Sequence, residues 1–140
     1  MTRPIVSAVI IDDDPVNNLI CERVLQCGNF ARQIIIHTEV KTALEFFATP
    51  QEKESATSQV IFLDLNMPVL NGWDFLREYD QKELHRANRK LYILSSSIYS
   101  ADLDRARAHP LVNGYISKPL DPGHLSSIAA GSQDFFIKMR

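Results

Sequence analysis

Five short apolar runs recur along this 140-residue chain, and they constrain its fold more than any other feature. The runs are IVSAVII, QIIIH, VIFL, LYIL and GYIS. A strand with one exposed face alternates apolar and polar residues, whereas these runs are nearly continuous. IVSAVII, VIFL, LYIL and GYIS therefore predict strands buried on both faces, and QIIIH predicts a further strand. Amphipathic stretches separate them. This alternation of strand and helix is typical of an α/β fold, a doubly wound parallel sheet with helices on both faces.

The first half of the chain predicts two strands and two helices. The first strand spans about residues 5–11, Pro15 suits the first turn of the following helix, and Gly28 suits its end. The spacing of apolar residues predicts that this helix buries Val16, Leu19, Ile20, Val24 and Leu25. The second strand covers residues 33–37, and Thr38 is expected to cap a second helix. The buried face of that helix is predicted to be Val40, Ala43, Leu44 and Phe47.

The second half repeats this pattern three times. Residues 49–58 are polar and contain a proline, so they are expected to form an exposed loop before the third strand, VIFL. A third helix begins near Trp73, and the fourth strand, LYIL, leads to a short helix that Ser100 can cap. GYIS is the fifth strand. Asp121 and Pro122 predict the start of a last helix, which Gly131 is expected to end or kink.

Polar residues stand directly after four of these strands. Three acids (Asp12 to Asp14) follow the first strand, Asp64 follows the third, Ser95 closes the fourth and Lys118 follows the fifth. The carboxyl ends of parallel strands meet at one edge of a sheet, which is where open α/β sheets bind ligands. The sequence therefore predicts one site that combines carboxylates, a hydroxyl and an ammonium group, a set suited to Mg²⁺ and phosphoryl chemistry.

Clustered carboxylates need a cation beside them. Two carboxylates about 4 Å apart repel by roughly 4 kcal/mol at an effective dielectric constant of about 20. Mg²⁺ takes oxygen ligands and is commonly held by one or two carboxylates, which Asp12 or Asp13 together with Asp64 could supply. A carboxylate can also act as the nucleophile in phosphoryl transfer, and Asp64, followed by a proline-containing turn, is the candidate.

Composition excludes several classes of function. A formal net charge of −2 gives no basic excess for nucleic-acid binding. Cys21 and Cys27 are predicted on different faces of one helix, and without a CxxC or Cys/His cluster a zinc site is not expected. Neither a signal peptide nor a membrane-spanning stretch is found in the sequence, so a cytoplasmic protein is expected, with no membrane partner. Residues 1–140 are predicted to form a single domain.

These residues resemble a known family. The segments IIDDD, DLNMP with the downstream NG, the Ser95-Ser96 pair and GYISKP look like the signature of a response-regulator receiver domain of the chemotaxis, two-component type. The resemblance runs from about residue 6 to the last helix. It implies a flavodoxin-like sheet with strand order 2-1-3-4-5. It also implies a stand-alone receiver without an output domain, which is a phosphoacceptor and not an enzyme.

The resemblance assigns a role to each polar residue. Asp64 would accept a phosphoryl group from a histidine kinase or a phosphotransfer protein. Asp13 would bind Mg²⁺ directly, Asp12 through water, and the backbone carbonyl of Asn66 would be a further ligand. Lys118, before a cis Pro119, would pair with a phosphoryl oxygen, whereas Asp14 would cap a helix.

The remaining roles implied by the resemblance concern the switch. Ser95 would bond the phosphoryl group and move toward it, and the Tyr115 ring would turn inward as Ser95 moves. A downstream target would bind the face made by the fourth helix (residues 100–108), the fifth strand and the last helix. Ser97, like Asn66, occupies a position that tunes dephosphorylation in the family.

Two alternatives remain at this point. One is a Mg²⁺-dependent phosphatase with an aspartyl nucleophile, which would need a second acid two residues after Asp64, where the sequence has Asn66. The other is a receiver-like scaffold that no longer cycles. Acid runs at strand ends are also common as helix caps and solvated rims, and a tyrosine in a strand is commonly a packing residue.

Overall fold

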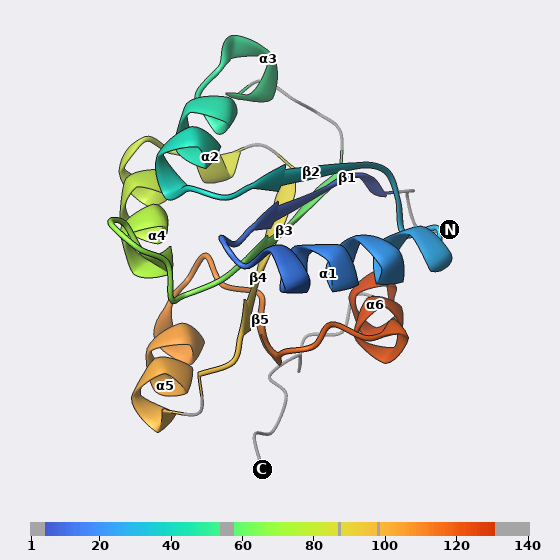
Figure 1. Ribbon diagram of the computed structural model, residues 1–140. Coiled ribbons are helices and arrows are strands. Elements are labelled where there is room, and N and C mark those ends of the chain that lie inside the picture. Colours follow the sequence, from blue (N-terminus) through green and yellow to red (C-terminus); the bar gives the residue numbers. More distant parts are fainter. Residues whose placement is uncertain (1–4, 54–57, 87, 98, 131–140) are drawn as a thin grey trace.

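Five parallel strands form one sheet in the computed structural model, which describes residues 5–53, 58–86, 88–97 and 99–130 (Figure 1). The order across the sheet is β2-β1-β3-β4-β5, which confirms the implied order. Every neighbouring pair is parallel, so all carboxyl ends meet at one edge. The strands are β1 (Ile5–Ile11), β2 (Ala31–His37), β3 (Gln59–Leu63), β4 (Arg89–Ser95) and β5 (Gly114–Ser117).

Helices cover both faces of this sheet, as Figure 1 shows. One face carries α1 (Pro15–Cys27) and α6 (Pro122–Ala129). The other carries α2 (Val40–Phe47), α4 (Gly72–Gln81) and α5 (Ser100–Ala108). A short α3 (Pro50–Lys53) follows α2, and a 3₁₀ turn, η1 (Leu84–Arg86), follows α4. The predicted α/β architecture is therefore confirmed.

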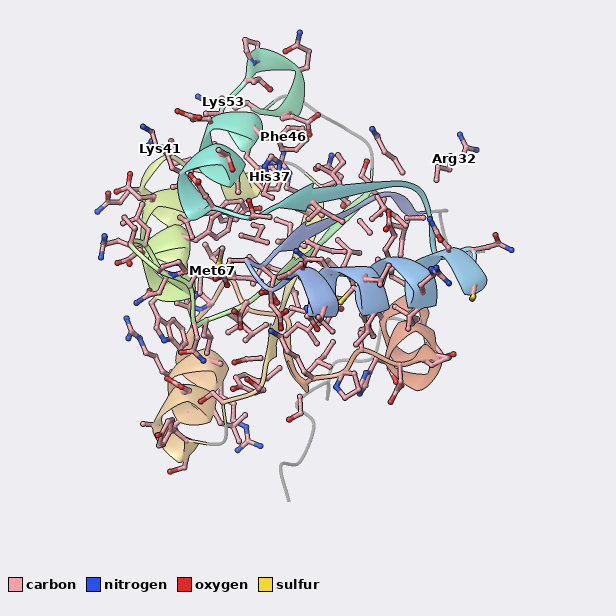
Figure 2. All side chains as sticks on the ribbon, viewed as in Figure 1. Arg32, His37, Lys41, Phe46, Lys53 and Met67 are labelled. Atoms are coloured by element: carbon pink, nitrogen blue, oxygen red, sulfur yellow. The ribbon has the colours of Figure 1, made fainter. Side chains whose placement is uncertain are left out.

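Alternate residues of each strand enter two separate cores. In β1, Val9 and Ile11 pack with α2 and α4, whereas Ala8 and Ile10 pack with α1 and α6. The whole of β3 is buried, which explains why apolar residues fill it after Gln59, whose side chain has hydrogen-bond partners. At the carboxyl end of β2, the His37 ring packs against Phe46 of α2 with 5.2 Å between ring centroids (Figure 2).

The predicted buried stripe of α1 is wrong for three of its five residues. Val16, Leu19 and Ile20 are 65%, 53% and 39% exposed, respectively. The helix instead buries Asn17, Asn18, Cys21 and Leu25. Its register is set by hydrogen bonds, because both asparagine side chains reach back to the residue that follows β1. The predicted buried face of α2, by contrast, is confirmed at all four positions.

Helix starts were predicted with mixed success. Asp14 caps α1 by accepting from the Val16 N–H, and Asp121 caps α6 in a capping box with His124, as expected. Thr38 and Ser100 are not caps: α2 and α5 start after Glu39 and Tyr99, which make no side-chain cap bond.

Two predictions concern segments outside the regular strands. Residues 50–53 form the one-turn α3 where a loop was predicted. The expectation for Gly131 lies outside the described residues.

Candidate functional site

Two acids from neighbouring strands meet at the carboxyl edge of the sheet. β1 and β3 are paired, and the Asp64 N–H donates to the Ile11 carbonyl at 2.9 Å, so Asp64 lies beside the residue that follows β1. One carboxylate oxygen from each of Asp12, Asp13 and Asp64 lies within 4.8 Å of the other two. Asp12 and Asp64 are buried and Asp13 is exposed. The structure therefore brings the three predicted acids together.

The protein itself satisfies both carboxylate oxygens of Asp12. Oδ1 accepts from the Asp14 backbone N–H at 2.9 Å. Oδ2 accepts from Asn17 Nδ2 at 2.8 Å and lies 2.7 Å from Lys118 Nζ. Asn18 Nδ2 donates to the backbone carbonyl of Asp12 at 2.9 Å. Lys118, two side-chain amides and a backbone N–H thus hold Asp12 in place.

Asp64 is in a different situation. Its Oδ1 is buried and has no hydrogen-bond partner. Lys118 Nζ lies 3.6 Å from this oxygen, close enough for an ion pair but too far for a hydrogen bond. Burial, together with the negative charge of Asp12, raises the pKa of Asp64 from 3.8 to about 6. Lys118 and a backbone hydrogen bond from Asn66 oppose this rise in pKa. A bound cation, or a covalent bond to the Asp64 carboxylate, would therefore stabilise this site.

Lys118 lies between these two acids. Its backbone N–H donates to the Ser95 carbonyl at 3.0 Å, and the Lys118–Pro119 peptide is cis, as predicted. Burial by itself would lower the pKa of Lys118, but the hydrogen bond to Asp12 and the charge of Asp64 raise it above its usual value. The side chain is therefore a permanent cation at neutral pH, and it contacts both buried carboxylates.

Ser95 and Tyr115, the two predicted switch residues, are both buried. Ser95 Oγ accepts from the Ser97 backbone N–H at 3.1 Å, and the Tyr115 hydroxyl donates to the Ser97 carbonyl at 3.2 Å. Burial raises the pKa of Tyr115, although hydrogen bonds to Ser95 and Ser97 oppose the rise, so the phenol stays protonated and remains a donor. The tyrosine ring points inward in this structure.

The loop from β3 to α4 closes tightly over the backbone of Asp64. A Cβ on Gly72 would lie 2.5 Å from the Asp64 carbonyl oxygen and 2.9 Å from Leu65 Cα, so only glycine fits there. Val69, in the same loop, is fully exposed and has a φ of 66°. Branching at Cβ makes that conformation costly for valine. The rim beside Asp64 is therefore both tightly packed and locally strained.

The donor set of the cluster fits a hard divalent cation. Three carboxylates lie close together, and the buried oxygen of Asp64 lacks a partner. Oxygen ligands of this kind suit Mg²⁺, which binds through one or two carboxylates and keeps several waters. Asn66 is exposed, and its N–H bonds the Asp64 carboxylate, which places its backbone at the same rim.

The sequence analysis missed Asn17 and Asn18, which fix Asp12 from α1. A signal was present, because two adjacent amides interrupt an otherwise apolar helical stretch. Buried amides need hydrogen-bond partners, and the acid before the helix supplies them. Among the residues that the structure describes, no helix is long and apolar enough to cross a membrane.

Comparisons with known proteins agree with this geometry. Residues 8–130 match the family model of the response regulator receiver domain. The probable methanogenesis regulatory protein FilR2 of Methanothrix harundinacea is 25% identical over 112 residues, which cover 80% of this chain and 71% of that protein. The crystal structure of a two-component response regulator from Cytophaga hutchinsonii has a TM-score of 0.79 and 26% identity, covering 93% of this chain and all of that one.

A second solved structure supports the fold alone. The response regulator receiver domain protein from Methanospirillum hungatei, described as CheY-like, has a TM-score of 0.64 and 21% identity. The match covers 89% of this chain and 91% of that one.

Proposed function

The chain belongs to the response regulator receiver domain family of two-component signalling, and we propose that it works as a phosphoacceptor through Asp64. The phosphoryl donor would be a phosphohistidine on a kinase or a phosphotransfer protein. One observation carries the proposal: Asp64 presents a buried carboxylate oxygen that no protein group bonds, at the sheet edge and beside Lys118. A carboxylate oxygen without a hydrogen-bond partner is suited to act as a nucleophile.

The transfer exchanges one bond for another. A carboxylate oxygen of Asp64 forms a P–O bond while the P–N bond of the donor imidazole breaks. The electron pair of the broken bond stays on the imidazole nitrogen, which takes up a proton. Lys118, which already contacts the carboxylates of Asp12 and Asp64, would neutralise charge on the phosphoryl oxygens.

Asp13, Asp64 and the Asn66 carbonyl would hold Mg²⁺, which neutralises phosphoryl charge when it is bound. Asp13 is the exposed member of the acid cluster, whereas both oxygens of Asp12 already have protein partners. This difference supports direct binding by Asp13 and an indirect role for Asp12, through water.

The output would be a change of surface over Ser95 and Tyr115. Ser95 would donate to the new phosphoryl group, and Tyr115 would report the change through α5, β5 and α6, where a downstream target protein would bind. A dianionic group added next to a two-state loop is a sufficient source of free energy for such a switch.

The donor protein must cover the rim of the site for its imidazole to reach Asp64. Exposed apolar residues of α1 begin close to this rim, since Val16 is only three residues after Asp13. Val16, Leu19 and Ile20 would therefore lie under the donor.

The test is phosphorylation by a small donor. Incubation with acetyl phosphate and Mg²⁺ should add one phosphoryl group to the intact protein, measured by mass spectrometry. Asp64→Asn should abolish the addition, whereas Asp104→Asn, at an exposed acid in α5, should not change it. An unchanged mass of the wild type, or phosphorylation that persists in Asp64→Asn, would contradict the proposal.

Turnover of a phosphomonoester would distinguish the phosphatase alternative from a phosphoacceptor. A phosphatase would turn over a phosphomonoester repeatedly, using an acid two residues after its nucleophile. This chain has Asn66 there, and an amide cannot transfer the proton. We therefore propose a protein that is phosphorylated rather than an enzyme with a phosphoester substrate.

A further inference from the structure

Ser97, two residues after Ser95, is hydrogen-bonded to three different parts of the switch region. Its N–H donates to Ser95 Oγ at 3.1 Å, and its carbonyl accepts from the Tyr115 hydroxyl at 3.2 Å. Its own hydroxyl donates to Asp102 Oδ2 at 2.6 Å. Ser97 is only 7% exposed; its bonds to Ser95 and Tyr115 are buried, and the bond to Asp102 is partly buried. A carboxylate of α5 therefore holds the residue to which both Ser95 and Tyr115 are bonded.

The bond from Ser97 to Asp102 is a strong one for its kind. A hydroxyl that donates to a carboxylate makes a charge-assisted bond, which is shorter and about twice as strong as a neutral bond. Asp102 lies in the first turn of α5, where the helix dipole favours a negative charge. The Tyr99 N–H also donates to Ser97 Oγ, at 3.4 Å. Ser97 is thus hydrogen-bonded both to Tyr99, just before α5, and to Asp102, in the first turn of α5.

This arrangement leaves Ser95 ready to bond a phosphoryl oxygen. A hydroxyl has two acceptor lone pairs and one proton, and the Ser97 N–H uses a lone pair of Ser95. This bond does not use the Ser95 proton, so the hydroxyl can turn from Tyr115 to a phosphoryl oxygen. The same contacts hold Tyr115 in its inward position, which the family resemblance associates with the activated state.

We propose that Asp102 is a positioning residue that holds Ser97, and through it Ser95 and Tyr115, in the arrangement that receives the phosphoryl group. The inference rests on the proposed function of Asp64 and names a residue that regulates that site. Asp102 acts through Ser97, and removal of its carboxylate allows Ser97 to leave this arrangement. The apparent affinity for a phosphoryl group falls in proportion to the fraction of molecules that keep the competent arrangement.

Beryllofluoride, which mimics a phosphoryl group on an aspartate, provides the test. Its affinity would be measured by isothermal titration calorimetry at a fixed, saturating Mg²⁺ concentration. Asp102→Ala should weaken the binding by about threefold, because a smaller fraction of the protein is competent. Asp102→Asn should restore most of the affinity, since its amide oxygen can accept the same bond from Ser97. Asp104→Ala removes an exposed acid from the same helix and should leave the affinity unchanged.

A second variant tests the same bond from its other end. Ser97→Ala should weaken the binding at least as much as Asp102→Ala, because it also removes the acceptor of the Tyr99 N–H. Adding Asp102→Ala to Ser97→Ala should cause no further loss, because the bond between the two side chains is already gone. Ser97→Ala alone tests the bond if Asp102→Ala does not fold.

Equal affinities of the wild type, Asp102→Ala and Ser97→Ala would overturn this inference while leaving the role of Asp64 intact. Absence of beryllofluoride binding by the wild type would instead overturn the proposed function, and this inference with it.

Discussion

Charged side chains are buried at both ends of the sheet, but the two ends differ in how fully those charges are hydrogen-bonded. At the amino ends of the strands, the Arg89 side chain is completely buried. Its guanidinium donates to Gln59 Oε1 at 2.6 Å and to the Leu84 carbonyl at 2.7 Å, and it bonds both the carbonyl and the carboxylate of Glu52. It also lies over the Phe47 ring, 4.6 Å from the centroid. Every nitrogen of this guanidinium therefore has a hydrogen-bond partner within the protein.

At the carboxyl ends the charges are left partly unsatisfied. Asp64 Oδ1 has no hydrogen-bond partner, its pKa is raised to about 6, and Asp13 remains exposed beside it. The same sheet therefore uses charge in two ways. A satisfied buried charge joins segments that are distant in the sequence, whereas an unsatisfied one costs stability and creates a reactive group.

Removal of the satisfied charge should have the largest effect on stability. Arg89→Ala leaves Gln59 Oε1 and the Leu84 carbonyl without their donor and Glu52 without its cation. It should lower the free energy of unfolding by about 3 kcal/mol, the low end of the cost of breaking a buried pair on one side, because Glu52 keeps its bond from the Gln59 amide. The change would be measured by urea unfolding followed by circular dichroism. Lys90→Ala, at the exposed neighbouring position, is the matched control and should change stability by less than about 0.5 kcal/mol. A loss as small as that of the control would mean that the Arg89 contacts do not join α3 to the sheet.

Removal of the unsatisfied charge should have the opposite sign. In the metal-free protein at pH 7, Asp64→Asn should raise the free energy of unfolding by about 2 kcal/mol, since the cost of ionising a buried acid disappears. Urea unfolding in the presence of a chelator would measure the difference, and added Mg²⁺ should reduce it by stabilising the wild type. A less stable Asp64→Asn protein would show that Lys118 already compensates the charge of Asp64.

The same acid predicts how stability depends on pH. The pKa of Asp64 is higher in the folded protein than the ordinary value of 3.8, so the folded state binds its proton more tightly than the unfolded state does. The contribution of Asp64 to the stability of the wild type therefore falls as pH rises from about 4 to about 6. The advantage of Asp64→Asn should be near zero at the lower pH and complete above the upper one.

The sequence was sufficient to predict the parts of the fold that follow from the pattern of apolar residues within a segment. Apolar runs predicted all five strands, although β2, at the edge of the sheet, has no buried residue, whereas β3 is buried throughout. The face of α2 was also predictable, since its apolar spacing is regular. The face of α1 was not, because the hydrogen bonds of Asn17 and Asn18 to Asp12 outweighed the burial of Val16 and Leu19.

For the site, residue types at strand ends predicted which side chains would meet, but not their partners. Nothing local in the sequence shows that Arg89 bonds Glu52 across 37 residues, or that Ser97 selects Asp102. Such contacts depend on the angles at which helices and loops cross the sheet. The acid cluster was predictable because parallel strands with the order found here must end at the same edge.

The smallest expected effect concerns backbone strain at the reactive end. Val69 is fully exposed with a φ of 66°, so it loses no packing on substitution, and Val69→Asn should raise stability by about 1 kcal/mol because asparagine tolerates this conformation. Val69→Thr, which keeps the branched Cβ, should give no gain. Glu83 also has a positive φ, of 57°, but is unbranched at Cβ. Equal urea midpoints for Val69→Asn and the wild type would show that backbone strain at Val69 costs no stability. The two ends of the sheet would then differ only in how their buried charges are satisfied.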